Sequence, residues 1–546
     1  MNGRLRGADI LARALARAGV RRVFTLSGNH VMPVFDAAID AKLELVHVRH
    51  EAAAVHMADA WARLTGEVGV ALVTGGPGHA NAVGALYTAL AAESPVLLLS
   101  GHAPLGELGR GAFQEMRQAD MAGPVCKAAS TATSAAAIGD EVARAFRTAK
   151  EGRPGPVHLS LPTDALEAVA DAGEWLVPHR DAFEVPAAPL GPAAAEATLA
   201  ELTRAERPLI LTGPATMRGR AATAVRQLER ATGVPVIGME SPRGIGDPSL
   251  GAFAELLARA DLVLLLGKQL DFTLRFGRMS AFDTACRFIQ IAPDLDAVQR
   301  ASRAVGERLI LSMVADVSPA AAELAQIAAG GRRREAWLHE VQEAVRYRPP
   351  EWALAASREG AIHPAALCRA VQKHLEGANA VFVSDGGEFG QWAQACLSAP
   401  NRLINGPAGS IGSALPFAAA AKLAFPAAPV VALLGDGTFG FHATEFDTAV
   451  RYGAPFVAVV GNDARWNAEY QIQLKSYGAE RAIGCELAPS RYDLVAAALG
   501  GHGEHVTRVE NLPAALERAF ASGRPACVNA MIDGLAAPNV TRRDVR

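Results

Sequence analysis

The chain has 546 residues, of which half are hydrophobic and 20% are charged. A chain this apolar buries enough surface to offset its ordering entropy, which excludes an intrinsically disordered protein, and the composition also excludes collagen-like and disulfide-scaffold chains. The 53 Lys and Arg nearly balance the 56 Asp and Glu. The resulting net charge of −3 gives no electrostatic reason to expect a nucleic acid or a membrane surface as a partner.

The cysteines and the N-terminus indicate the compartment. The six cysteines lie far apart and form no CxxC pair, which fits free thiols in a reducing compartment. The N-terminal segment MNGRLRGADILARALARAGV has no continuous apolar stretch of signal-peptide length. No apolar run approaches the roughly 20 residues that span a bilayer. We therefore expect a soluble, cytoplasmic protein without a membrane anchor.

The first part of the chain alternates short β-branched or leucine-rich runs with alanine-rich stretches. Parallel strands that are buried on both faces have this composition, and helices are the usual crossovers between them. The pattern predicts strands at 20–26, 43–48, 68–74, 94–100 and 155–161. We place this first α/β domain at residues 1–178.

Two more α/β domains are predicted after it. A Pro- and Ala-rich stretch at 177–194 indicates an exposed linker, and a charged helical connection starts at Gly330. Strands are expected at 208–213, 235–239, 261–267 and 287–292, and then at 380–386, 430–437, 456–463 and 526–532. We place the second domain at 190–330, the third at 360–535 and a tail at 536–546. The predicted fold class is α/β, with three doubly wound parallel-sheet domains.

The strongest functional signal lies in the third domain. Asp436 and Asp463 each follow a predicted buried strand, one βαβ unit apart, and open α/β sheets bind ligands at the carboxyl ends of their strands. Two oxygens there can hold a Mg²⁺ whose other ligands are phosphate oxygens. Gly435 and Gly437 would let the backbone approach those phosphates, and Thr438 would supply a donor. The alternative is a plain strand, turn and helix with an acidic N-cap.

This pair of segments resembles the signature of the thiamine-diphosphate (ThDP) enzymes, GDG followed by Asn-Asn after the same interval. The resemblance extends over essentially the whole chain and implies a pyrimidine-binding first domain, a central domain and a diphosphate-binding third domain. It implies Asp436, Asp463 and the carbonyl of Arg465 as Mg²⁺ ligands. Asp463 departs from the family, which usually has Asn there. The added charge is expected to weaken cofactor binding, or Asn462 is expected to shift into the ligand's place.

Two more segments of the third domain resemble cofactor contacts of ThDP enzymes. In GPAGSIGSALP, the resemblance implies that the Gly409 carbonyl accepts a hydrogen bond from the 4′-amino group and that Ile411 bends the cofactor. Taken alone, this segment would be a strand-to-helix turn with Ile411 in the core. The loop at 385–390 resembles the family's other diphosphate loop, and its alternative is an ordinary βα loop. That loop supplies the candidate contacts Asp385, Gly386, Glu388 and Phe389.

The first domain supplies the candidate catalytic carboxylate. In VRHEAAAVHM, Glu51 follows a strand and opens a helix, where the helix dipole alone favours an acid. The segment also resembles the RHE segment of ThDP enzymes, which implies a contact from Glu51 to N1′ of the pyrimidine. A proton shared there promotes loss of the thiazolium C2 proton, and the cofactor then does the carbon–carbon chemistry. The turn at 74–86 resembles a family turn that faces the cofactor, with Pro77 and Asn81 as the expected contacts.

Two residues of the first domain point to the reaction. His30 follows the first strand, and Gln114 lies on a later loop. This pairing resembles benzaldehyde lyase. We expect a neutral His30 imidazole to act as acid or base near pH 7 while the Gln114 amide orients a carbonyl. The alternative for His30 is a loop histidine that caps the following helix.

The resemblance leaves several reactions open. We expect a carbon–carbon lyase or carboligase that acts next to a carbonyl, on a 2-hydroxyketone, a 2-oxo acid or a 2-hydroxyacyl-CoA. One alternative is an acetolactate-synthase-type transferase of 2-oxo acids, although WNAEYQIQLKSYG replaces that group's substrate-side segment. Another is a non-catalytic ThDP- or nucleotide-binding regulator, for which the Asp463 departure is the only support.

The remaining expectations concern further ligands and assembly. The central domain resembles one that binds FAD or ADP in some family members; Lys268 and Arg275 are candidate phosphate partners, whereas Ala292 stands where an acidic residue often meets the ribose. The tail from Thr541 would either meet CoA phosphates or be a solvated basic tail. In this family the counterparts of Glu51 and the GDG loop meet across a subunit interface. The resemblance thus implies a homodimer or a dimer of dimers.

Overall fold

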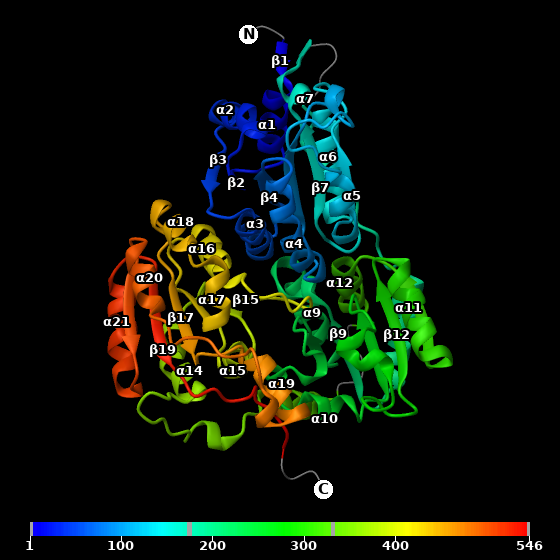
Figure 1. The fold of residues 1–546 in the computed structure, drawn as a ribbon. Coiled ribbons are helices and arrows are strands. Elements are labelled where there is room, and N and C mark those ends of the chain that lie inside the picture. Colours follow the sequence, from blue (N-terminus) through cyan, green and yellow to red (C-terminus); the bar gives the residue numbers. More distant parts are fainter. Residues whose placement is uncertain (1–3, 172–176, 329–333, 543–546) are drawn as a thin grey trace.

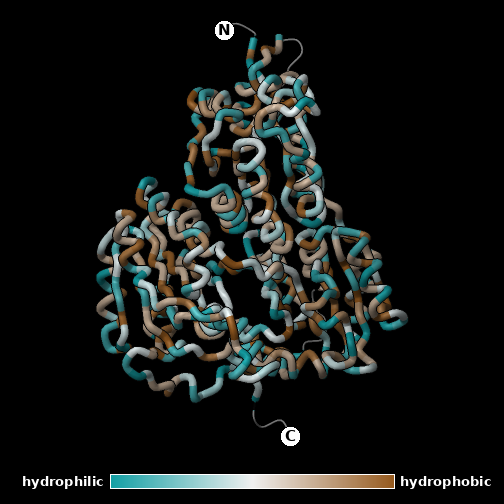
Figure 2. Tube along the Cα trace, viewed as in Figure 1, coloured by the Kyte–Doolittle hydropathy of each residue, from teal (hydrophilic) through white to brown (hydrophobic). Residues whose placement is uncertain are grey.

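The computed structural model describes residues 4–171, 177–328 and 334–542. Three parallel sheets, each flanked by helices, form three domains, with the first domain above the second and third in Figure 1. The α/β fold class that the sequence predicts is confirmed. Figure 2 shows hydrophobic residues along the strands inside the domains and hydrophilic residues along many outer loops.

The first domain holds a six-stranded parallel sheet in the order β3-β2-β4-β5-β7-β6. Every residue of β4 and β5 is buried, as expected for strands that helices cover on both faces. The strands are β2 (Arg22–Thr25), β3 (Glu44–His47), β4 (Gly69–Val73), β5 (Val96–His102), β6 (Ala128–Thr131) and β7 (Val157–Pro162), with a small antiparallel pair of β1 (Arg4–Arg6) and β8 (Val169–Asp171). The helices are α1 (Gly7–Arg17), α2 (Met32–Ala41), α3 (Glu51–Thr65), α4 (Pro77–Ala91), α5 (Gln118–Ala122), α6 (Ile138–Lys150) and α7 (Thr163–Glu167).

The second domain holds a five-stranded parallel sheet in the order β10-β9-β11-β12-β13. The strands are β9 (Pro208–Thr212), β10 (Val236–Gly238), β11 (Leu262–Leu266), β12 (Arg287–Ala292) and β13 (Leu309–Val314). The helices are α8 (Pro192–Arg204), α9 (Gly219–Thr232), α10 (Phe253–Leu257), α11 (Leu295–Val305), α12 (Val317–Ile327) and α13 (Glu335–Arg346). The start of the predicted charged connection, 330–333, lies outside the described residues.

The predicted linker at 177–194 is less exposed than its composition suggests. A short 3₁₀ turn at Arg180–Phe183 buries the ring of Phe183, which meets the edge of Phe146 with ring centroids 5.6 Å apart. The aromatic contact holds the connection against the first domain, so the expectation of an exposed linker is wrong at Phe183.

The third domain holds a six-stranded parallel sheet in the order β15-β14-β16-β17-β19-β18. The strands are β14 (Val381–Asp385), β15 (Asn401–Ile404), β16 (Val430–Gly435), β17 (Val457–Asn462), β18 (His502–Val506) and β19 (Ala526–Met531). The helices are α14 (Pro364–Gln372), α15 (Glu388–Cys396), α16 (Ala414–Ala424), α17 (Asp436–His442), α18 (Glu445–Arg451), α19 (Asn467–Tyr477), α20 (Tyr492–Ala498) and α21 (Leu512–Ala521).

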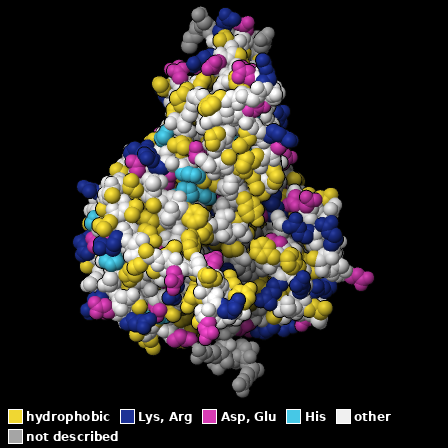
Figure 3. All heavy atoms as spheres, in the orientation of Figure 1, with side chains coloured by type: hydrophobic (Ala, Val, Ile, Leu, Met, Phe, Trp, Pro, Cys, Tyr) yellow, Lys and Arg dark blue, Asp and Glu magenta, His cyan; other side chains and the backbone are white. Residues whose placement is uncertain are grey.

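The first and third domains of one chain share a hydrophobic core. Helix α3 packs against α16, and buried Arg63, paired with Asp59, donates a hydrogen bond of 2.7 Å to the carbonyl of Ile404. Figure 3 shows histidine side chains at the surface where these two domains meet. No helix in the described ranges is long and apolar enough to cross a membrane.

Candidate active site

A cleft of about 210 Å³ lies at the carboxyl ends of β14, β16 and β17. Parallel sheets place their ligand crevices at this edge. Its lining includes Gly386, Glu388, Phe389, Gly409, Ile411, Gly435, Gly437 and Thr438, together with Asp436, Asp463 and Arg465. The structure therefore brings together nearly all of the residues that the sequence suggests in the third domain.

Asp436 and Asp463 share this cleft. Because β16 and β17 are neighbours with Gly435 opposite Gly461, the two carboxylates follow adjacent strand ends. Asp436 is 2% exposed, and its Oδ2 has no hydrogen-bond partner among the described residues. Burial raises the pKa of Asp436 to about 6, and burial together with the charge of Asp436 raises the pKa of Asp463 to about 7. A buried carboxylate and a half-buried one that repel each other are suited to holding a cation.

Asn462 does not take the place of Asp463. Its side chain is fully buried, and its Nδ2 donates to the carbonyl of Ser490 at 3.0 Å and to Oδ1 of Asn529 at 3.1 Å. Its Oδ1 accepts the backbone N–H of Ala464, a residue with a positive φ of 54°. Asn462 thus holds the loop in shape, which leaves Asp463 facing the cleft.

Two glycines of the cleft stand at positions that have no room for a side chain. A Cβ at Gly437 would stand 2.6 Å from the ring of Trp466, and one at Gly386, where φ is +89°, would stand 2.5 Å from Oγ1 of Thr438. A side chain at either position would therefore push apart the residues that line the cleft. The acidic pair and the glycine-lined wall fit a diphosphate held through a divalent cation.

Asp385 has a different position from the one predicted. It lies behind the cleft wall, fully buried, and its Oδ2 accepts the backbone N–H groups of Gly412 at 2.9 Å and Ala414 at 3.0 Å. His442 binds the same turn, because its Nδ1–H donates to the carbonyl of Gly412 at 2.7 Å. Asp385 and His442 therefore hold the turn that carries Gly409 and Ile411 from two sides.

The tail and the second domain also reach the cleft. The backbone N–H of Ala537 donates to Oε2 of Glu388 at 2.6 Å, and Arg243 lies 3.6 Å from the same carboxylate. Farther along the tail, Arg542 binds Glu255 of the second domain through two hydrogen bonds of 2.8 Å. This pairing, and not a free basic tail, is what the structure shows at Arg542; residues 543–546 lie outside the described part.

In the first domain, Glu51 begins α3 after β3, as the sequence predicts. The side chain is 8% exposed, and Nδ2 of Asn81, on α4, donates to its Oε2 at 3.0 Å. The N-cap of α3 is His50, whose Nδ1 accepts the backbone N–H of Ala52 at 3.1 Å. Pro77 is the first residue of α4 and fixes the turn before it.

His30 and Glu51 both lie near Thr74 in the first domain. Its Nδ1 is 3.2 Å from Oγ1 of Thr74, and a Cβ built at Gly78 would touch both Thr74 and Oε1 of Glu51. The ring of Phe113 stacks on His30 with centroids 6.1 Å apart. The N-cap of α2 is Val31, whose side chain makes no cap bond, and the side chain of His30 contacts Thr74 instead of the helix. Burial lowers the pKa of His30, which favours the neutral imidazole.

Gln114 follows Phe113 and has a positive φ of 58°. Its Oε1 is buried without a hydrogen-bond partner in the described part of the chain. The glutamine that holds the neighbouring Gly76 turn is Gln118, whose Oε1 accepts the backbone N–H of Gly76 at 2.9 Å. Gln118 was not singled out from the sequence, since its contact joins segments far apart in the chain.

The two halves of the predicted site are separate within one chain. Among the described residues that line the cleft of the third domain, none of Glu51, His30 and Gln114 is found. These three lie on the first domain, and the cleft lies on the third.

The central domain does not present the nucleotide partners that the sequence suggests. Lys268 is 4% exposed and binds Asp271 at 3.2 Å, whereas Arg275 is exposed and Ala292 is buried. Residues of the first domain reach the strand ends of the second domain instead. Glu93 accepts the backbone N–H of Ala215 at 3.1 Å. Arg153 forms hydrogen bonds with Glu93, with the carbonyl of Gly267 and with Asp294. The expectation of FAD or ADP there gains no support.

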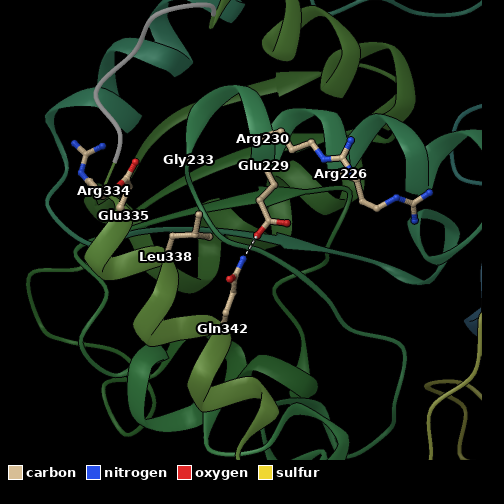
Figure 4. A pocket seen from close by; sticks show the side chains of 8 residues that line it. All are labelled: Arg226, Glu229, Arg230, Gly233, Arg334, Glu335, Leu338 and Gln342. Carbon is tan, nitrogen blue, oxygen red and sulfur yellow. Dashed lines mark hydrogen bonds between the residues drawn. The ribbon is translucent and has the colours of Figure 1, made fainter.

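A larger cavity of about 340 Å³ lies in the second domain between α9 and α13. Figure 4 shows Glu229 and Gln342 hydrogen-bonded across it, while Arg226 and Arg230 extend away from Gln342. It lies away from the strand ends that carry the motifs, and it brings together no set of catalytic groups. The smaller cleft of the third domain is therefore the candidate site.

Comparison with known families agrees with this assignment. Residues 5–121 match the thiamine pyrophosphate enzyme N-terminal TPP binding domain, residues 195–324 the central domain, and residues 385–530 the C-terminal TPP binding domain. The chain belongs to the thiamine pyrophosphate enzyme family. The family resemblance that the motifs suggested is thus confirmed.

Curated relatives of this thiamine pyrophosphate enzyme match nearly its whole length. The acetolactate synthase large subunit IlvG of Mycobacterium tuberculosis is 34% identical over 537 residues, covering 96% of this chain and 95% of the relative. The 2-hydroxyacyl-CoA lyase 2 of Homo sapiens is 31% identical over 582 residues (96% and 90%), and that of Danio rerio is 30% identical over 588 residues (96% and 91%). The chain is a ThDP-dependent enzyme, which argues against the alternative of a non-catalytic regulator.

Sequence reasoning missed several residues of this thiamine pyrophosphate enzyme. Arg243 enters the cleft from another domain, so no local pattern points to it. Trp466 and Asn467 also line the cleft; they stand directly after the strand-end motif, a position that would have pointed to them. His442 lies in the same helix as Asp436, yet its role depends on the distant Gly412.

Proposed function

We propose that this enzyme makes or breaks a carbon–carbon bond next to a carbonyl group, acting as a lyase or carboligase on a 2-hydroxyketone, a 2-oxo acid or a 2-hydroxyacyl-CoA. The observation that carries the proposal is that His30 and Glu51 both lie near Thr74: His30 contacts Thr74 through its Nδ1, and Glu51 lies across Gly78 from Thr74. An imidazole, a group suited to proton transfer near neutral pH, then stands in the same part of the first domain as the carboxylate expected to serve the cofactor. The relatives named 2-hydroxyacyl-CoA lyase 2 favour the same class of reaction.

The cleft of the third domain would hold the diphosphate of ThDP through Mg²⁺. Asp436, Asp463 and the backbone carbonyl of Arg465 would be the protein ligands, and phosphate oxygens would complete the coordination. Among the described residues, no group of three or more His, Cys, Asp or Glu side chains is suited to a metal. This agrees with a site in which the cofactor provides some of the metal ligands. Gly386, Gly437 and Thr438 would contact the phosphates, and Gly409 and Ile411 the aminopyrimidine.

ThDP, when bound, supplies the nucleophilic carbon and the electron sink for the reaction. The protein would supply proton transfer and orientation. Glu51, held by Asn81, would keep a proton at N1′ of the pyrimidine. Neutral His30 would take the proton from a substrate hydroxyl and return it to a carbonyl oxygen. The NH₂ group of Gln114 would donate to a substrate carbonyl oxygen, and its unpartnered Oε1 would accept from a substrate hydroxyl.

A second copy of the chain would complete the site. Within one chain Glu51 does not line the cleft, so a two-fold related partner would bring its first domain over the third. Figure 3 shows hydrophobic side chains gathered on the visible face of the first domain. The exposed large hydrophobic side chains of that domain include Met32, Tyr87, Leu105, Leu108, Phe113 and Met121. A surface of this kind is typical of an interface.

The second candidate is an acetolactate-synthase-type transfer between 2-oxo acids, which the 34% identity to the mycobacterial relative favours. The two reactions give different products. The test incubates the enzyme, ThDP and Mg²⁺ with benzoin, with a 2-hydroxyacyl-CoA and with pyruvate, and follows the products by NMR.

We expect an aldehyde to be released from the hydroxyketone or the hydroxyacyl-CoA, because His30 can take the hydroxyl proton. Acetolactate from pyruvate, with neither of the other compounds consumed, would instead establish the synthase. A Glu51→Gln variant run in parallel identifies any product that does not depend on the site.

A further inference from the structure

The cleft of the third domain carries more negative charge than its own cations balance. Asp436 and Asp463 share its floor, and Glu388 and Glu469 are also in its lining. One oxygen of Asp436, a side chain 2% exposed, is buried without a partner among the described residues. A buried carboxylate with an unpartnered oxygen is costly, and a cation beside it would lower that cost.

Each of the two arginines in the lining has a partner other than Asp436, although the charge of Arg465 also acts on Asp463. The guanidinium of Arg465 lies over the ring of Tyr470, 4.5 Å from its centroid. Arg243 lies 3.6 Å from Glu388, at the side of the cleft. Neither arginine therefore bonds to the unpartnered oxygen of Asp436, and a ligand has to bring the missing positive charge.

A diphosphate would increase this imbalance, since it would add further negative charge to a cleft that already holds buried Asp436 and half-buried Asp463. Like charges at short range repel strongly where water is excluded. A divalent cation bound to Asp436 and Asp463 reverses the sign of the local field and turns this repulsion into attraction.

We propose that Asp463 turns the Asp436 site into a cation site that fills before the cofactor arrives, so that the divalent cation binds the free enzyme and ThDP follows it. This order of binding rests on the proposed function, in which the cleft holds ThDP. Asn462 does not substitute for Asp463, because both ends of its amide are held by the loop and by Asn529.

The test measures Mn²⁺ binding to the full-length, cofactor-free enzyme by calorimetry and by electron paramagnetic resonance. We expect one Mn²⁺ per chain for the wild type and a rise in its Tm with Mn²⁺ alone. The isosteric variant Asp463→Asn should bind Mn²⁺ at least about tenfold more weakly, since ligand charge sets cation affinity. Asp436→Asn should lose the site. Asp533→Asn removes a carboxylate near the cleft but outside its lining, and should bind as the wild type does.

A second titration adds ThDP in the presence of EDTA. Without a cation, Asp463→Asn should bind ThDP more tightly than the wild type, because it has lost one repelling charge. Equal Mn²⁺ affinity of wild type and Asp463→Asn, or tight binding of ThDP to the metal-free wild type, would overturn the inference. Should the variant not fold, the wild-type Mn²⁺ stoichiometry and Tm shift still decide whether the free enzyme binds the cation. Failure of ThDP to bind even with saturating Mg²⁺ would refute the proposed function instead.

Discussion

At the scale of single residues, the surroundings of His30 decide its protonation. The ring lies under Phe113 and against Thr74, and burial lowers its pKa, so the neutral base prevails at pH 7. A neutral imidazole next to a substrate hydroxyl can accept its proton, which an imidazolium cannot do.

Replacing His30 by Ala should lower kcat by about 10²–10⁴-fold, the usual contribution of a general acid or base. ThDP affinity and the exchange rate of the C2 proton of bound ThDP should stay near wild type, because Glu51 and the cleft are untouched. The wild type should lose kcat as the pH falls through the lowered pKa of His30, and the variant should lack that limb. The measurement is a pH profile of kcat together with NMR of C2 exchange.

His339 gives a matched control, since it is an exposed histidine on α13 of the second domain. His339→Ala should keep the wild-type profile. Wild-type kcat in His30→Ala would show that the histidine is a packing residue and would remove the main support for lyase chemistry.

At the scale of elements, the shape of the cleft depends on loops that are held in place by a buried side chain behind the cleft wall. The carboxylate of Asp385, at the end of β14, accepts backbone N–H groups of Gly386, Gly412 and Ala414. It thereby joins the loop before α15 to the turn before α16, and both loops line the cleft. Burial raises the pKa of Asp385 to about 6, although these hydrogen bonds oppose that shift.

Asp385→Ala should lower the free energy of unfolding by about 1–3 kcal/mol for each N–H left buried and unpaired. It should also weaken ThDP binding, because Gly409 and Ile411 lose their support. Urea unfolding and ThDP titration measure the two effects. Asp40→Ala, which removes an exposed carboxylate on α2, should change neither. Undiminished ThDP affinity in a folded Asp385→Ala would show that the turn holds its shape without this residue.

The fold class and most of the cleft could be predicted from the sequence, because both depend on residues that are close together in the chain. Hydrophobic runs marked the strands, and polar residues directly after β16 and β17 marked the cleft, because parallel strands end at one edge. The position of Asp385 was predicted less well: a residue after a strand can face the ligand or the neighbouring turn, and the partners that decide this lie 27 to 29 residues away. Contacts between domains, such as that of Arg243, leave no local pattern at all.

At the scale of the whole molecule, the packing of one chain keeps its own Glu51 away from its own cleft. Helix α3 lies against α16, and the buried Asp59–Arg63 pair ties it to β15, so the first domain is fixed beside the third. Movement of Glu51 into the same chain's cleft would break this shared core. In the proposed dimer, a partner chain would supply the missing half without such a change.

Mixing two inactive variants tests this account most directly. Glu51→Gln keeps an intact cleft, and Asp436→Asn keeps an intact first domain. When equal amounts are unfolded together and refolded, half of the dimers should be hybrids, and one of the two sites in each hybrid should be intact. We predict recovery of about a quarter of the wild-type activity. No recovery, in hybrids shown to form by differential tagging, would mean that Glu51 serves its own chain and would contradict the account.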